Sequence, residues 1–329
     1  MNIVEKCSIL SGVTSANNSV FIAVMNDGLA EQRRQHAIAL SLKNETWSSI
    51  ACEPVLPWLV AGITTIDQPS LQTVIVGWGG QVSVLDGDAC HREGIQRKDS
   101  KDVSIVRSVA AIDNVVYAAG MRRQVHKRVG PNSWLEIDRN VAYEGDRIDV
   151  GFNTIGGFDR TEVYAGGLNG EIWRYDDRQW RQIQSPTNVH LHSMCCASDG
   201  SVYLGGRAGV LLRGRHDSWE ILDIGVGETI WDLHWFLDKL YLVTNGGVFT
   251  YIDGQLEQVK SALLSYGDFL RFSSSRDRLW IFGRRRIARF DGLVWNKQSS
   301  DLSDAEISSP VFRFFTDDVL SLGSDYLEA

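Results

Sequence analysis

Short apolar runs separated by polar turns follow one another along almost the whole chain, and their order repeats. The stretch TEVYAGGLNGEIWRYDDRQW at residues 161–180 has a close counterpart in GSVYLGGRAGVLLRGRHDSW at residues 200–219. One apolar residue fixes the same register in each unit: Val20, Val74, Val116, Val163, Val202, Leu240 and Leu279. The steps between them are 54, 42, 47, 39, 38 and 39 residues. A repeat of about 40 residues predicts a fold made of equal stacked units.

A second residue keeps pace with the first and supports the same register. It follows the first anchor by 16 to 18 residues, and it is a tryptophan in four of the units. The tryptophans are Trp134, Trp180, Trp219 and Trp295, and Cys90 and Leu256 take the same place in two further units. A large flat side chain that recurs at one position is typical of packing between neighbouring units.

Each unit reads as four short strands. An apolar run comes first, then a strand such as VYAGG, then an alternating strand such as EIWRY, and then the tryptophan strand. The β-branched and aromatic residues, with Gly, Asn and Asp between the runs, favour strands over helices. Four-stranded antiparallel units of this length are the blades of a β-propeller, which is an all-β fold.

Seven full units extend from about residue 6 to residue 299, and a half unit follows in which Val319 lies 40 residues after Leu279. We therefore predict one β-propeller domain over residues 1–329, with about seven blades and eight as the alternative. Because a free sheet edge is a liability, we expect the ring to close by pairing of the N- and C-terminal strands. The long first step predicts a loop insertion at residues 26–35 in the first blade.

The repeats resemble those of kelch-like propellers. The resemblance rests on a glycine doublet after the second strand, an aromatic residue on the third and a tryptophan after it. These residues are Gly166-Gly167, Gly205-Gly206, Tyr175, Trp180 and Trp219. The resemblance covers nearly the whole chain and implies a propeller, but propellers of one shape serve many functions, so it assigns none.

Composition narrows the class of protein. Of the 329 residues, 43% are hydrophobic and 22% are charged, which is ordinary for a globular chain. No apolar run is long enough to span a membrane, and the first residues lack the pattern of a secretory signal. The five cysteines are odd in number and lack a paired metal spacing, which favours a reducing cytoplasm. The net charge of -8 argues against a nucleic-acid binder.

The repeat also predicts what one face of the ring carries. Loops between the second and third strands of all blades must emerge on the same side. They hold Trp78, Arg122, Arg123, Asn169, Arg207, Asn245, Arg284, Arg285 and Arg286. Arg and Trp are enriched in binding hot spots, so we predict that Trp78 and the six arginines bind one protein partner with an acidic contact surface. The alternative is that these cations merely solvate exposed turns, where a charge contributes little.

Metal and catalytic patterns are weak. His190, His192, Met194 and Cys196 lie on one face of a strand, but a set spread along one strand cannot surround an ion alone. We therefore predict no metal and no cofactor. The carboxylates Asp146, Asp149, Asp159 and Glu162 could meet near the mouth of the ring, although turn chemistry explains most of them. Trp231 and Trp235 lie outside the tryptophan register and are candidates for contact or for the core.

Three classes of function remain. The first is a non-enzymatic binding protein, and within it an immunity or inhibitor protein that caps a toxic enzyme, monomeric on its own. The second is a carbohydrate-active or other hydrolytic propeller with a site in the central channel, which needs a carboxylate cluster there. The third is a scaffold module of a larger complex. We favour the first, because no catalytic constellation stands out.

Overall fold

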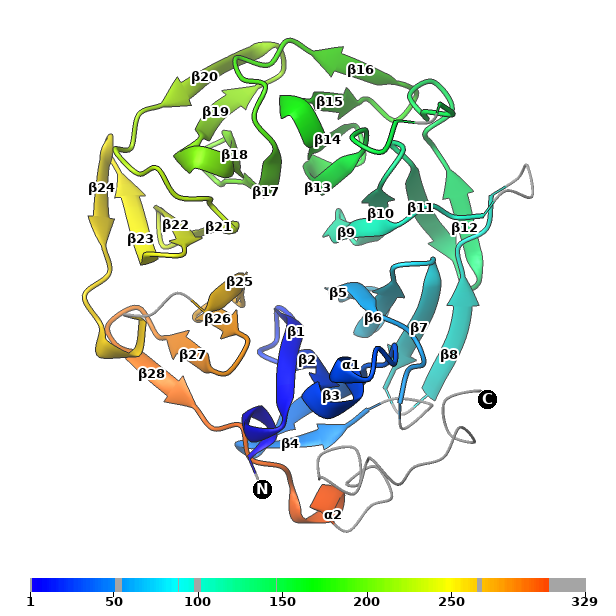
Figure 1. The fold of residues 1–329 in the computed structure, drawn as a ribbon, viewed down its shortest axis with the longest axis vertical. Coiled ribbons are helices and arrows are strands. Elements are labelled where there is room, and N and C mark those ends of the chain that lie inside the picture. Colours follow the sequence, from blue (N-terminus) through cyan, green and yellow to red (C-terminus); the bar gives the residue numbers. More distant parts are fainter. Residues whose placement is uncertain are drawn as a thin grey trace.

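The computed structural model describes residues 2–50, 55–87, 89–97, 102–145, 147–264 and 268–307. Seven four-stranded antiparallel sheets are arranged around a common axis (Figure 1). In every sheet the four strands are consecutive in the sequence, with the first innermost and the fourth at the periphery. The prediction of an all-β propeller with seven blades is therefore confirmed.

The first two blades contain β1 (Cys7–Thr14), β2 (Val20–Asn26), β3 (Ile38–Lys43), β4 (Thr46–Ser49), β5 (Val60–Ile66), β6 (Gln72–Gly77), β7 (Gln81–Asp86) and β8 (Ala89–Gly94). The third and fourth contain β9 (Val106–Ile112), β10 (Val115–Gly120), β11 (Val125–Gly130), β12 (Ser133–Glu136), β13 (Phe152–Asp159), β14 (Glu162–Gly167), β15 (Ile172–Tyr175) and β16 (Trp180–Ile183).

The last three blades contain β17 (Leu191–Cys196), β18 (Val202–Gly206), β19 (Leu211–Arg215), β20 (Ser218–Leu222), β21 (Asp232–Phe236), β22 (Lys239–Thr244), β23 (Gly247–Ile252), β24 (Gln255–Gln258), β25 (Phe269–Ser274), β26 (Leu279–Gly283), β27 (Ile287–Phe290) and β28 (Trp295–Gln298). The helical turns are η1 (Ile3–Glu5), α1 (Asp27–Glu31), η2 (Leu168–Gly170), η3 (Arg207–Gly209), η4 (Ala262–Leu264) and α2 (Asp304–Ile307). No helix in the described part of the chain is long and apolar enough to cross a membrane.

Both anchors of the repeat fall on the strands that the sequence predicts. The Val and Leu anchors lie on the second strands, and the tryptophan anchors with Cys90 and Leu256 lie on the fourth strands. Blade 1 also has such a residue, Trp47 on β4, which the spacing concealed because α1 lies between β2 and β3. Trp47 comes 27 residues after Val20, instead of 16 to 18.

The core lies between the blades. Trp47, Trp280 and Phe282 belong to one buried cluster shared by blades 1 and 7, and similar clusters join the other neighbours. Gly12 on β1 is required by this packing, because a Cβ there would lie 2.5 Å from the ring of Phe282. Each blade therefore buries both of its faces only when it has a neighbouring blade on either side.

The two ends of the chain meet at blade 1, as the prediction of closure by pairing of the N- and C-terminal segments requires. Among the described residues the two ends of the chain pair through isolated bridges, Asn2 with Asp301 and Trp47 with Leu302. The indole Nε1 of Trp47 also donates to the carbonyl of Ser299, at 2.9 Å. The half unit expected around Val319 lies outside the described residues.

The cysteines are not all free thiols. Cys90 is disulfide-bonded, whereas Cys7, Cys195 and Cys196 are free. Burial raises the pKa of the Cys7 and Cys195 thiols to about 12, so they stay protonated and unreactive. The expectation of a reducing cytoplasm rested on unpaired cysteines, so the bonded Cys90 removes that support for it.

Candidate functional site

One side of the ring, which we call the rim face, carries the loops between second and third strands together with the linkers between blades. Backbone hydrogen bonds tie these two sets of segments to each other. The amide of Val106 donates to the carbonyl of Trp78 at 2.8 Å, and that of Arg122 donates to Val150 at 2.9 Å. Farther along the chain, the amide of Arg207 donates to the carbonyl of His190 at 3.0 Å. The loops that hold Trp78 and the six arginines therefore share one surface.

Three of the six arginines are exposed and available on this surface. Arg122, Arg207 and Arg284 are exposed, and none forms an ion pair with a described residue. Trp78 is 47% exposed in the loop that follows β6. Tryptophan has a large flat ring and arginine a planar forked guanidinium. Such side chains can make many contacts with a partner while losing little conformational entropy.

The other three arginines are held by the protein itself. Arg123 makes two 2.7 Å hydrogen bonds to the Glu171 carboxylate, and its guanidinium lies 5.4 Å from the Trp173 ring centre. Arg285 pairs with Asp27 at 2.6 Å and also donates to the carbonyl of Val4.

Arg286 is held in the same way, because it pairs with Asp268 at 3.1 Å and its guanidinium lies 5.8 Å from the Phe269 ring centre. Arg123, Arg285 and Arg286 therefore each have an acidic partner within the chain.

Exposed apolar side chains lie on the same face. Ile105 and Ile148 precede β9 and β13 and are 47% and 87% exposed. Trp231 is 38% exposed, and its Nε1 donates to Asn245 Oδ1 at 2.7 Å. Trp235 is instead half-buried and stacks on Tyr203, with ring centres 6.0 Å apart. Apolar and aromatic groups mixed with arginines are the composition of a protein interface.

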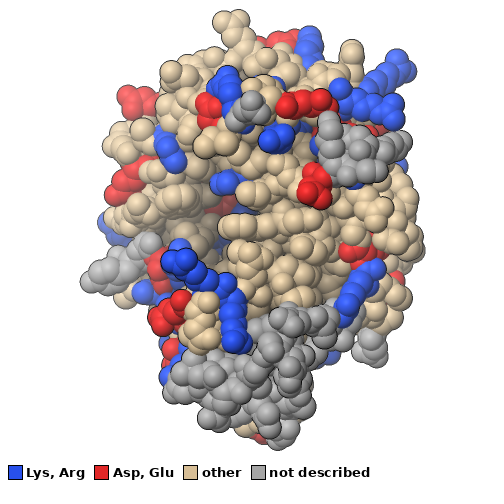
Figure 2. Space-filling view, turned by 45° about the vertical axis from the view of Figure 1, so that its right-hand side comes forward, with Lys and Arg blue, Asp and Glu red and all other residues tan. Residues whose placement is uncertain are grey.

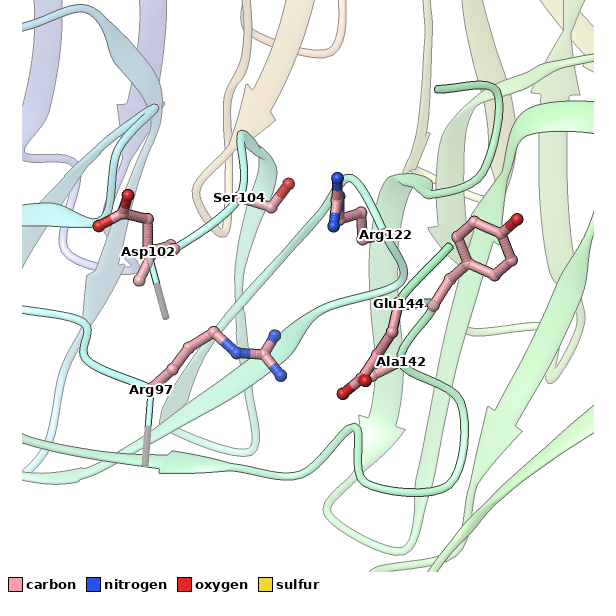
Figure 3. Close-up of a pocket in the computed structure, with 8 residues that line it drawn as sticks. Arg97, Asp102, Ser104, Arg122, Ala142 and Glu144 are labelled. Atoms are coloured by element: carbon pink, nitrogen blue, oxygen red, sulfur yellow. The ribbon is translucent and has the colours of Figure 1, made fainter. Parts of the chain in front are cut away.

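A pocket of about 470 Å³ lies on the rim face between blades 2, 3 and 4 (Figure 3). Its walls include Arg97 and Asp102 on one side and Arg122 and Glu144 on the other. The Arg122 backbone has a φ of 59°, in the left-handed region that many tight turns of this chain use. The lining of the pocket carries charges of both signs.

A buried polar cluster lies behind Arg97. Its guanidinium is 3.2 Å from the Glu136 carboxylate and 3.6 Å from that of Asp138. Burial raises the pKa of Asp138 to about 6. His126 on β11 is fully buried with neither ring nitrogen hydrogen-bonded, and burial lowers its pKa to about 4. Sequence patterns gave no sign of this cluster, because its members come from separate segments.

The surface around blades 2 and 3 carries both signs of charge. Figure 2 shows Lys and Arg interspersed with Asp and Glu among a majority of uncharged residues. A single-sign field of the kind that attracts nucleic acid does not dominate this view.

The residues with metal-like spacing are used in other ways. The His190 Nδ1 accepts from the Asn169 amide at 2.9 Å, and the His192 ring lies 5.7 Å from that of Trp231. Met194 and Cys196 pack against a hydrophobic cluster around β18. Within the described ranges no group of three His, Cys, Asp or Glu side chains has the geometry to hold a metal ion.

The carboxylates that the sequence offered as candidates for acid-base catalysis do not lie together. Asp149 lies on the rim face and is paired with Arg147 at 2.7 Å, whereas Asp159 and Glu162 lie at the opposite end of β13 and β14. Glu162 is held there by Arg215 and by the Tyr164 hydroxyl. Asp146 lies outside the described residues.

Comparisons with known proteins agree with the fold and add a family. The chain is 37% identical to the immune protein Tsi7 of Pseudomonas aeruginosa over 303 residues, which are 88% of this chain and 96% of that protein. No family model matches the chain.

Two solved structures are similar in shape. YCF48 from Cyanidioschyzon merolae has a TM-score of 0.61 and 11% identity, over 86% of this chain and 94% of that one. The extracellular domain of the putative hybrid two-component system BT4673 of B. thetaiotaomicron has a TM-score of 0.62 and 12% identity, over 90% of this chain and 38% of that one. At such identities the likeness shows the propeller fold alone.

Proposed function

The chain belongs to the family of the immune protein Tsi7, and on this premise we propose that it is an immunity protein, a non-enzymatic propeller that binds a toxin and blocks its action. The observation that carries the proposal is the 37% identity over nearly the full length of both proteins. An identity spread over 96% of the relative extends across the whole ring and not over a few repeats.

We propose that the toxin binds to the rim face. Support comes from Trp78, Arg122, Arg207 and Arg284, which are exposed there without ion pairs to described residues. Exposed Ile105, Ile148 and Trp231 add apolar area to the same surface. Three uncompensated guanidinium groups favour a partner with an acidic contact surface, because complementary charges steer association and fix register.

Other properties follow from the same proposal. An inhibitor that needs only a docking face requires neither nucleic acid nor a membrane, and it can act as a monomer in the cytoplasm. Catalysis is not part of the proposal, because the carboxylates Asp149, Asp159 and Glu162 are paired or hydrogen-bonded and lie at opposite ends of the blade. The loose likeness to kelch repeats stays a prediction.

The test is a deletion of the gene in its native organism. Cells without the protein are expected to stop growing beside sister cells that carry the toxin, and a plasmid copy is expected to restore growth. Second mutations that restore growth then identify the toxin gene. Normal growth of the deletion strain under these conditions would favour a scaffold or a hydrolytic propeller instead.

The binding face is tested with the purified toxin by titration calorimetry. The variant Arg122→Glu, Arg207→Glu, Arg284→Glu is expected to lose binding. The matched control reverses the same number of charges elsewhere, at Arg160, Arg181 and Arg213. These three residues are exposed and pair with Asp113, Asp217 and Glu220. Equal loss in both variants would place the contact outside the rim face.

A further inference from the structure

Five residues lie on the inner part of the rim face, in segments of blades 3, 5 and 6. We call this group the inner socket: Arg107, His190, His192, Arg207 and Trp231. Arg107 and His192 are the second residues of β9 and β17, and Arg207 opens η3. The charges of Arg207, His190 and Arg107 each act on the His192 ring, which lies on the rim face with them. The contact that defines the centre of the group is that of the His192 ring with the Trp231 ring, whose centres are 5.7 Å apart.

Local structure holds the socket in place. The His190 carbonyl accepts from the Arg207 amide at 3.0 Å, which ties η3 to the start of β17. The His190 Nδ1 accepts from the Asn169 amide, and the Trp231 ring is fixed by Asn245 and faces His192. Ala208, next to Arg207, has a φ of 53°, an unfavourable left-handed conformation that the surrounding bonds maintain.

The positive charge of the socket is not neutralised within the described part of the chain. Neither Arg107 nor Arg207 forms an ion pair with a described residue, and Arg107 is exposed. The carboxylate that acts on His190 is that of Asp149, which already accepts two hydrogen bonds from Arg147. Among the described residues these two guanidinium groups therefore have no paired carboxylate, in a protein whose net charge is -8.

One polar atom of the socket is buried without a partner. The His192 Nε2 is shielded from water and makes no hydrogen bond to any residue that the structure describes. Burial, followed by Arg207, His190 and Arg107, lowers the pKa of His192 to about 4, so the free protein holds this ring neutral. A buried polar atom without a hydrogen bond is costly, and a ligand that supplies the bond recovers that cost.

Resting on the proposed function, we propose that the inner socket receives an aspartate or glutamate side chain of the toxin. A carboxylate accepts hydrogen bonds from a guanidinium in the bidentate manner and also accepts one from an imidazole N–H. Trp231 provides a flat apolar wall for the methylene groups of the same side chain. The inner socket lies among the exposed residues of the rim face, so a toxin bound to the rim face also covers the socket.

Calorimetric titration of the purified toxin into single variants tests the socket. Arg107→Gln and Arg207→Gln are each expected to weaken binding about 10- to 100-fold, because each leaves a buried toxin carboxylate short of a partner. Arg181→Gln is the matched control, an exposed arginine on β16 paired with Asp217. Urea unfolding of each variant shows whether it is folded as the wild type.

Charge reversal identifies the carboxylate. Arg207→Glu is expected to abolish binding, and one Asp→Arg or Glu→Arg variant of the toxin is expected to restore it. Arg107→Gln and Arg207→Gln variants that bind as tightly as the wild type would overturn the socket and leave the immunity function standing. Failure of the wild type to bind the toxin at all would refute the proposed function itself.

Discussion

Replacement of Trp47 tests how the ring is closed. Trp47 is fully buried on β4, and its Nε1 donates to the Ser299 carbonyl at 2.9 Å, across 252 residues of sequence. Its amide donates to Asp301 and its carbonyl accepts from Ser303, each at 2.9 Å. The side chain therefore joins the outer edge of blade 1 to the segment that follows blade 7.

The expected magnitude follows from these contacts. Trp47→Phe keeps an aromatic ring but leaves the Ser299 carbonyl without its donor, which costs about 1 to 3 kcal/mol. The missing second ring leaves a cavity that adds about 1 kcal/mol. We expect the free energy of unfolding to fall by about 2 to 4 kcal/mol, a large part of the stability of a typical domain.

Urea unfolding followed by circular dichroism measures this change. The control is Trp219→Phe, which removes the same kind of bond, from an indole to the His216 carbonyl at 2.9 Å, but within one exposed turn. The control is expected to lose less than about 1 kcal/mol. A loss at Trp47 no greater than that at Trp219 would refute the view that Trp47 secures the closure.

Three further predictions concern the core and the rim face. Gly12→Ala is expected to lower the free energy of unfolding by about 1 to 3 kcal/mol, because the new Cβ meets the Phe282 ring at 2.5 Å; an unchanged urea midpoint contradicts this. Arg285→Ala is expected to reduce stability by about 1 kcal/mol through its contacts to Asp27 and Val4 without weakening toxin binding, whereas Arg284→Ala weakens binding and leaves stability unchanged. Urea unfolding and calorimetric titration of both variants test this prediction. Weaker toxin binding by Arg285→Ala, or lower stability of Arg284→Ala, would contradict it. His126 has a folded pKa of about 4 against an ordinary 6.5, so the unfolded chain takes up the proton first and stability falls as the pH drops from 6.5 to 4. His126→Leu is expected to remove about 3 kcal/mol of that fall in stability. The charged neighbours Glu136 and Arg97 are present in both proteins, so they do not cause the difference. If the free energies of unfolding of the variant and the wild type, measured in urea, change in parallel with pH, the assignment to His126 is wrong.

Periodicity made most of the fold predictable. The anchors Val163 and Trp180 recur in the sequence because every blade needs an apolar second strand and a large residue on the fourth. Trp47 was not recognised in the sequence as the matching residue of blade 1. The helix α1 adds residues within this blade, which changes the spacing in the sequence but not the position of Trp47 on the fourth strand. The pairing of the two chain ends was predicted, but its individual hydrogen bonds around Ser299 were not, because they follow no repeated pattern.

The site was predictable only in part. A loop position is fixed by the repeat, so the sequence places Arg122 and Arg285 on one face. Whether such an arginine is available depends on the charges of other loops: Arg285 meets Asp27 from the first blade, and Arg123 meets Glu171 from the next. The sequence did not indicate that Ile148 is exposed on this face, because an apolar residue is more readily assigned to the core.

The order of the strands also constrains how the protein is made. Each blade consists of consecutive strands, so blades 1 to 7 leave the ribosome complete and in order. The partner of Trp47 is synthesised 252 residues later, a delay of about 10 to 50 s at ordinary rates of translation. During that interval the outer edge of β4 lacks its contacts with the segment around Ser299. The loops of the rim face belong to blades that have not yet formed a closed ring. A newly made chain therefore completes its ring, and with it the rim face, only after blade 7 and the segment that contains Ser299 have been synthesised.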